Sequence, residues 1–153
     1  MDYSRTHSAF LTLQELAQKS VDDAVIKLKK ADDKYHNAQQ QLNELRDYYL
    51  EYQQRLHYSL TKGVKSGDLT NLHAFIGTLE KSISLQQQQL LSLSIKQKQA
   101  TQHLFQCQKK LNGYKTLLEK KHLILLEQQN RLQQKLTDEF AQQQSVRRTM
   151  YES

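Results

Sequence analysis

The chain has 153 residues, only 37% of them hydrophobic, and a mean hydropathy of −0.81, which is too little apolar material for a globular core of ordinary thickness. It contains no proline or tryptophan and is rich in glutamine, leucine and lysine, residues that favour long helices. The net charge is +6, and residues 96–153 hold the excess with 11 basic and 5 acidic side chains, so this half suits nucleic acid, anionic lipid or an acidic protein, or is simply a solvated lysine face.

A first helix is predicted over about residues 8–60. Its apolar residues recur in alternating steps of four and three, which is typical of a coiled-coil seam, the line along which two helices touch. The seam residues are Ala17, Val21, Ala24, Leu28, Ala31, Tyr35, Ala38, Leu42, Leu45, Tyr49, Tyr52 and Leu56. Because alanine recurs every seven residues from Ala17 to Ala38, we expect the helices to approach closely there and to spread towards the turn.

The turn is predicted over about residues 61–68, which contain Gly63 and Gly67 and end on Asp68, a candidate helix N-cap. A second helix is predicted over about residues 69–140. Its sevenfold row is Ile76, Ile83, Leu90, Leu104, Leu111, Leu118, Leu125 and Leu132, with Leu72, Leu79, Leu93, Ala100, Cys107 and Tyr114 as companions. Gln86, Gln97 and Lys121 interrupt this pattern, and polar seam residues of this kind usually fix the register.

The two runs predict a single all-α domain, a two-helix antiparallel coiled-coil hairpin with an overhanging C-terminal helix. A turn near residue 64 places residue i opposite about residue 129 − i. The first helix then ends its contacts near Lys121, and the second continues unpartnered to about Phe140. Residues 141–153 are expected to be a frayed tail.

No catalytic, cofactor or metal site is predicted. The one metal-like spacing, His103 with Cys107, supplies too few ligands for zinc. Glycine-rich phosphate loops and nucleophile motifs are missing from the sequence, and the single cysteine excludes an internal disulfide. The longest apolar run, residues 123–126, is far shorter than the roughly 20 residues that span a bilayer. We therefore expect a cytoplasmic protein that binds other proteins and uses no small-molecule substrate.

An excess of aromatic residues lies close to the predicted turn. Tyr48, Tyr49, Tyr52 and Tyr58 fall within eleven residues, and Phe75 follows the turn. The seam needs only some of them, so the others are either interface residues or tyrosines packed along the seam edge with their hydroxyls in water.

The sequence resembles the flagellar type III export protein FliJ family over nearly its whole length. The resemblance rests on the order and spacing of non-seam residues at five places. These are residues 21–24 (VDDA), residues 41–52 with Asp47, Tyr48 and Glu51, residues 75–76 (FI), residues 78–81 (TLEK) and residues 138–142 (DEFAQ).

This resemblance implies a stalk-like component of the flagellar export apparatus with three partners. They are the hexameric export ATPase, whose ring it helps to assemble, the cytoplasmic domain of the membrane-embedded export gate, and export chaperones. The expected location is the cytoplasm, peripheral to the inner membrane at the flagellar base. The alternative is a basic coiled coil that binds nucleic acid or an anionic membrane surface.

Two groups of binding residues are expected. By resemblance, the gate and chaperone surface, here called the aromatic patch, consists of Gln41, Leu45, Tyr48, Tyr52, Phe75 and Leu79. The next two positions of the patch are Ser82 and Gln86, where relatives can carry alanine and histidine. The ATPase surface, here called the C-terminal apolar set, consists of Leu123, Ile124, Leu126, Leu132, Leu136 and Phe140 in the predicted overhang.

Overall fold

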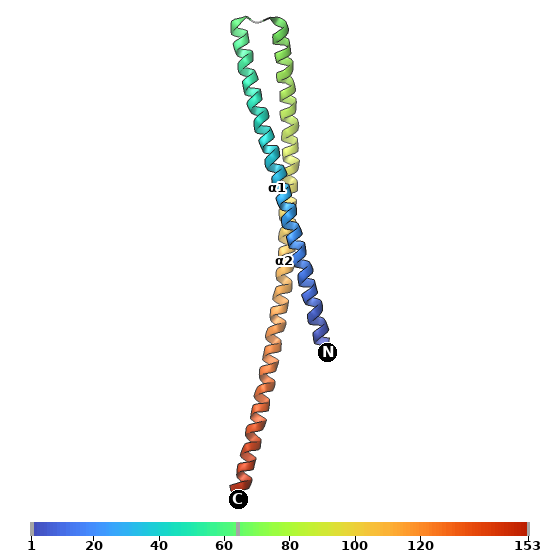
Figure 1. Ribbon diagram of the computed structural model, residues 1–153, viewed down its shortest axis with the longest axis vertical. Coiled ribbons are helices and arrows are strands. Elements are labelled where there is room, and N and C mark those ends of the chain that lie inside the picture. Colours follow the sequence, from blue (N-terminus) through green and yellow to red (C-terminus); the bar gives the residue numbers. More distant parts are fainter. Residues whose placement is uncertain (1, 64, 153) are drawn as a thin grey trace. The chain divides into compact units, whose positions relative to one another are not determined.

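The computed structural model describes residues 2–63 and 65–152, with side chains from Ser4 onward. They form two helices, α1 (Asp2–Lys62) and α2 (Ser66–Glu152) (Figure 1). The predicted all-α hairpin of two helices is confirmed. Both helices are longer than predicted, because α1 begins before Ser8 and α2 continues beyond Phe140.

The helices contribute to two compact units. One unit consists of Ser20–Cys107 and contains the turn, and the other consists of Met1–Lys19 together with Gln108–Ser153. The organisation of the whole chain as a single domain stays a prediction.

In the unit that contains the turn, α1 and α2 pack against each other through one layer of side chains. Every predicted seam residue in this unit is buried or half-buried. The predicted register is also confirmed, since the residue numbers sum to 129 for the pairs Asp32–Gln97 and Tyr49–Glu80, whose side chains are hydrogen-bonded. The rings of Tyr52 and Phe75 are also in contact, and these two residue numbers sum to 127, two less than the register predicts.

Residue size in the seam sets the separation of the helices. Ala24 is 1% exposed and Ala38 is 5% exposed, so their small side chains are covered by the facing helix, and Ala31 is half-buried. Towards the turn the larger side chains of Tyr49 and Tyr52 occupy the seam. The burial of the alanines supports the predicted close approach there, and the spreading at the turn stays a prediction.

Two glutamines that interrupt the seam form hydrogen bonds across it. The Gln97 amide donates to a carboxylate oxygen of Asp32 at 2.6 Å. The Gln86 amide donates to the Ala38 backbone carbonyl at 2.9 Å and to the Gln41 side-chain oxygen at 3.2 Å. Because these bonds form only in one alignment, they support the predicted role of the glutamines in fixing the register.

The turn is tighter than predicted. Gly63 has a φ of 71°, in the left-handed region that glycine adopts without a steric cost. The backbone carbonyl of Lys65 accepts bonds from Asp68 and Leu69, at 3.1 and 3.3 Å. The prediction of Asp68 as the N-cap is wrong, because α2 already begins at Ser66. Asp68 lies in the first turn instead, where its negative charge stabilises the helix N-terminus.

In the other unit, the start of α1 packs against α2 through Ala17 and Leu111, which are both buried. The Lys121 ammonium lies 3.8 Å from the centre of the Phe10 ring, a cation–π contact. This seam extends to the half-buried Leu125, and every residue from Leu126 to Glu152 is exposed. The predicted overhang is therefore present, but it begins after Leu125 rather than near Lys121.

The prediction of a frayed tail over residues 141–153 is wrong for the described part, since α2 is helical to Glu152. Ser153 lies outside the described residues. The segment contains glutamine, arginine and methionine, which favour helix, and no glycine or proline that would end it.

Substituting Ala24 with leucine should destabilise the hairpin by about 1 to 3 kcal/mol, because extra methylene groups overpack a position that is 1% exposed. Chemical unfolding followed by circular dichroism measures this. Ala74→Leu is the matched control, because Ala74 is exposed on α2 and the same change there should cost less than about 0.5 kcal/mol. Equal stabilities for the two variants would contradict the seam.

Tyr49 forms a polar contact between the helices near the turn. Its hydroxyl donates to a carboxylate oxygen of Glu80 at 3.1 Å and accepts a bond from the Gln53 amide at 2.8 Å. The bond to Glu80 raises the pKa of Tyr49 above its ordinary value of 10.0, desolvation and the Glu80 charge raise it further, and the Gln53 bond opposes the rise. The folded state therefore favours the neutral phenol.

The contribution of Tyr49 to stability should be fully present below pH 10.0 and should fall as the pH rises through the raised folded-state pKa. We expect the melting temperature of the wild type to exceed that of Tyr49→Phe by more at about pH 8 than at about pH 10.5. Tyr58→Phe is the control, because Tyr58 is 60% exposed. A difference between wild type and Tyr49→Phe that does not change with pH would refute this assignment.

Candidate functional site

The described ranges offer surfaces for proteins rather than a centre for chemistry. They contain no group of three or more histidine, cysteine or acidic side chains that could hold a metal ion. Cys107 is half-buried in the seam, with its sulfur 3.7 Å from Nε2 of His103. Neither described helix has a stretch apolar enough to cross a membrane. The predicted binding residues lie in two groups on the helices, and they differ in exposure.

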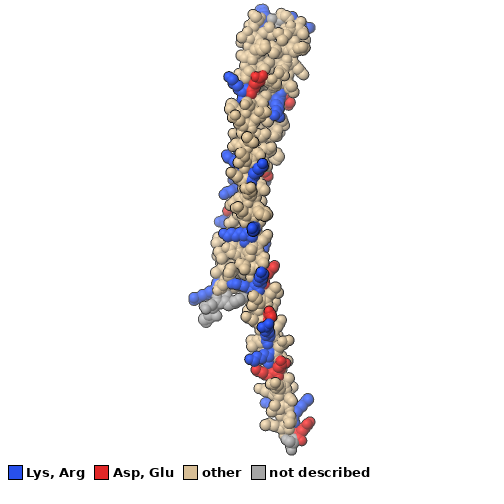
Figure 2. Space-filling model, turned by 180° about the vertical axis from the view of Figure 1, so that it is seen from behind, with Lys and Arg blue, Asp and Glu red and all other residues tan. Residues whose placement is uncertain are grey.

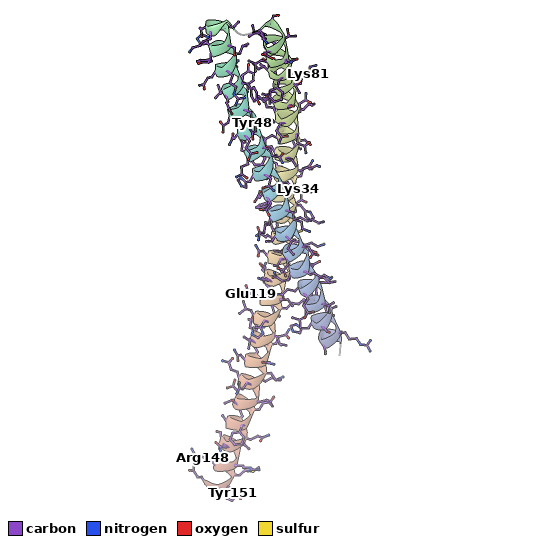
Figure 3. All side chains as sticks on the ribbon, turned by 45° about the horizontal axis from the view of Figure 1, so that its top comes forward. Lys34, Tyr48, Lys81, Glu119, Arg148 and Tyr151 are labelled. Carbon is purple, nitrogen blue, oxygen red and sulfur yellow. The ribbon has the colours of Figure 1, made fainter. Side chains whose placement is uncertain are left out.

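The aromatic patch lies on one edge of the hairpin within the unit that contains the turn. On α1 its residues follow steps of four, three and four from Gln41 to Tyr52, which place them along one side of the seam. The Tyr52 and Phe75 rings meet across the helices with their centres 4.4 Å apart and their planes at 52°. Figure 3 labels Tyr48 on this part of α1.

The patch residues differ in how accessible they are. Tyr48 is 54% exposed and Phe75 is 43% exposed, and Gln41 is also exposed, whereas Leu45 and Tyr52 are half-buried in the seam. The expectation that Leu79 belongs to an exposed surface is wrong, because Leu79 is only 6% exposed and packs in the core. Its effect on a partner would have to act through the packing of its neighbours.

A shallow groove of about 670 Å³ extends the patch away from the turn. Its lining residues are Gln41, Leu45, Ser82, Leu85, Gln86, Gln88 and Gln89. Leu85 is 66% exposed beside these amide groups. The two expected positions Ser82 and Gln86 thus lie in the groove, half-buried, and the hydrogen bond from Gln86 to Gln41 joins its two sides.

Two residues of this surface were not predicted. Leu85 could not be singled out, because one exposed leucine on a helix is ordinary until a groove is seen beside it. Arg55 lies seven residues after Tyr48, and its guanidinium stacks 4.9 Å from the centre of the Tyr52 ring while pairing with Glu51 at 2.9 Å. The seven-residue spacing from Tyr48 is the sequence pattern that could have identified Arg55 as part of this surface.

The C-terminal apolar set lies in the other unit, at exposed positions of α2, and its members from Leu126 onward follow the last seam residue, Leu125. Its six members are between 41% and 63% exposed. Leu118, Leu125 and Leu132 are seven residues apart, so the seam face of α2 continues past its last contact with α1. Val146 and Met150, 57% and 75% exposed, add apolar surface further along the helix. They were not predicted, because this segment was expected to be disordered.

Charged side chains form no continuous patch on the face drawn in Figure 2. On the face drawn in Figure 2, lysine and arginine side chains lie singly among uncharged ones, with carboxylates near some of them. The two salt bridges within the described residues join neighbours on one helix turn, Glu51 with Arg55 and Glu127 with Arg131. Exposed pairs of this kind contribute little to stability, so the seam residues supply most of the association between the helices.

A solved structure of a protein described as a YscO homologue from Chlamydia trachomatis is similar to this fold. The TM-score is 0.69 over 90% of each chain, at 18% sequence identity. This likeness concerns the fold alone.

Sequence relatives carry more information. The chain is 36% identical over 142 residues to the flagellar FliJ protein of Escherichia coli strain K12 and 34% identical to that of Salmonella typhi, and each alignment covers 93% of this chain and 97% of the relative. The family model for the flagellar FliJ protein matches residues 6–149. The chain therefore belongs to the flagellar FliJ protein family, and it is a non-enzymatic component of flagellar protein export.

Proposed function

We propose that this chain is a stalk-like adaptor of the export apparatus. In this proposal the C-terminal apolar set binds the hexameric export ATPase and promotes assembly of its ring, and the aromatic patch binds the cytoplasmic domain of the export gate. Export chaperones are the third class of partner. Binding to a membrane-embedded gate would hold the protein in the cytoplasm, peripheral to the inner membrane at the flagellar base.

The observation that carries the proposal is the uncovered part of α2. From Leu126 to Glu152 each residue is exposed, yet Leu132, Leu136 and Phe140 continue the apolar residues of α2 beyond the part that packs against α1. Apolar surface of this extent is characteristic of a binding site. A single helix inserted among several ATPase subunits would contact more than one of them, and a ligand that binds only the assembled ring stabilises that ring by mass action.

The aromatic patch supports the second part of the proposal. Tyrosine and phenylalanine are enriched at the energetic centres of interfaces, because they bury a large rigid surface at a small cost in conformational entropy. Tyr48 and Phe75 are exposed and lie beside a groove lined by glutamines. A partner segment could place apolar side chains on the rings and form hydrogen bonds with the amides.

Replacing Leu132, Leu136 and Phe140 together with alanine should abolish most of the stimulation of the export ATPase. The loss of three exposed apolar contacts should weaken binding to the ATPase by roughly tenfold or more, while helicity stays unchanged because alanine favours helix. ATPase assays and sedimentation of the ring measure the two effects. Gln128, Gln134 and Gln142, all exposed, changed to alanine serve as the control. Full stimulation by the apolar variant would exclude this surface.

Replacing Tyr48 and Phe75 with alanine should weaken binding to the purified cytoplasmic domain of the gate by about tenfold or more. Tyr48 and Phe75 are about half exposed, so circular dichroism should show an intact hairpin. Tyr58→Ala is the control, because Tyr58 is 60% exposed and outside the patch. If calorimetry gives the same affinity for the double variant and the wild type, the patch is not the gate site.

A further inference from the structure

Along α1, the edge that carries the aromatic patch changes from aromatic to amide and then to basic side chains. Counting back by sevens from Tyr48 gives Gln41, Lys34 and Lys27, and each of these residues immediately precedes a seam residue. Residues in the same heptad position lie along one side of a helix in a coiled coil. Lys27 and Lys34 are therefore on the patch side of α1, and both are exposed.

The same continuation occurs on α2. Counting forward by sevens from Phe75 gives Ser82, Gln89, Lys96 and His103, which also immediately precede seam residues and are exposed except for the half-buried Ser82. In an antiparallel pair, equivalent flanking positions of the two helices line the same edge. This edge thus passes from aromatic residues near the turn through the amides of the groove to lysines.

The register places lysines of the two helices opposite each other. The hydrogen bond between Asp32 and Gln97 aligns the helices at this level, so Lys34 and Lys96 flank the seam almost directly across from one another. We call Lys27, Lys34 and Lys96 the basic strip. Figure 3 labels Lys34 and Tyr48 on α1, which are 14 residues apart, roughly 21 Å at 1.5 Å per residue.

The basic strip has no anionic partner within the described part of the chain. None of its three lysines forms a salt bridge there, and α2 contains no aspartate or glutamate between Glu80 and Glu119. Like charges across a seam weaken the pairing of the helices slightly. The strip therefore does not serve the stability of the hairpin, and its charge is available to an incoming anion.

We propose that the basic strip binds carboxylates of the same partner segment whose apolar residues cover the aromatic patch. The inference rests on the proposed gate site and specifies the chemistry of what it recognises: a segment that is apolar at one end and acidic at the other. A helix of about 15 residues, or a shorter extended segment, spans the interval from Tyr48 to Lys34.

Continuity with the patch favours a protein segment over a phosphate backbone or a lipid surface. The residues between the rings and the lysines are Gln41, Ser82 and Gln89, which are uncharged hydrogen-bonding groups. A polypeptide can pair with rings, amides and lysines in succession. A membrane or a nucleic acid would gain from the lysines alone and would leave the aromatic part of the edge unused.

The test measures binding of the full-length chain to the purified cytoplasmic domain of the gate, at about 50 mM and about 300 mM NaCl. The variant is Lys34→Gln with Lys96→Gln, and the matched control is Lys29→Gln with Lys98→Gln. Lys29 and Lys98 follow the seam residues Leu28 and Gln97, so they lie on the opposite edge and lose the same charge. Both pairs are exposed, so both variants should stay as helical as the wild type.

We expect Lys34→Gln/Lys96→Gln to lower the affinity at low salt by roughly three- to tenfold, mainly through slower association, and to reduce the salt dependence of binding. The control should stay within about twofold of the wild type. Unchanged binding by the strip variant, or an equal loss in the control, overturns the inference.

The same experiment separates this inference from the function on which it rests. If Tyr48→Ala/Phe75→Ala loses binding and the strip variant does not, the gate site stands and the basic strip is not part of it. If neither variant loses binding, or the wild type does not bind, the gate site fails and the inference fails with it. Vesicles of phosphatidylcholine and phosphatidylglycerol in equal parts complete the test, because a strip variant that loses only vesicle binding would identify a lipid site instead.

Discussion

A single layer of side chains between two helices is the constraint on which the rest of this structure depends. That layer covers the small side chain of Ala24 almost completely and includes the larger, half-buried side chains of Tyr49 and Tyr52 near the turn. A two-helix seam covers only about two residues in every seven on each helix, so most side chains stay in water. Large apolar residues outside the seam therefore stay exposed, and where several lie together, as in the C-terminal apolar set, they are candidates for partner binding.

The seam could be predicted from the sequence because its pattern has a fixed period. Each expected seam residue up to Leu125 is buried or half-buried, and the turn position gave the register found between Asp32 and Gln97. The helix ends could not be predicted equally well. The apolar periodicity ends after Phe140, although no glycine or proline follows to end the helix. Asp68 has a side chain suited to capping, although α2 already begins at Ser66.

The candidate site was predictable only in part, for a similar reason. Resemblance supplied a set of residues, and the heptad pattern had already placed three of them, Leu45, Tyr52 and Leu79, in the seam. Leu45 and Tyr52 are half-buried there, and Leu79 is 6% exposed. Leu79 is buried, as the heptad pattern predicts, rather than exposed on the binding surface, because burial follows from the position on the helix. Leu85 required the structure, since the groove beside it forms only when the two helices are paired, whereas Arg55 contacts the ring of Tyr52, three residues earlier on the same helix.

One edge of the hairpin carries carboxylates that join the helices, and the other edge carries the residues proposed to bind partners. The hydrogen bonds from Tyr49 to Glu80 and from Gln97 to Asp32 use carboxylates that follow seam residues, so they lie on the edge opposite the aromatic patch. On the patch edge, two sevenfold rows contain no carboxylate, namely Lys27, Lys34, Gln41, Tyr48 and Arg55 on α1 and Phe75, Ser82, Gln89, Lys96 and His103 on α2. The Glu51 carboxylate beside them pairs with Arg55 on the same helix. Because the carboxylate bonds that join the helices and the proposed partner contacts use different edges, substitutions on the patch edge can change binding while those bonds stay intact.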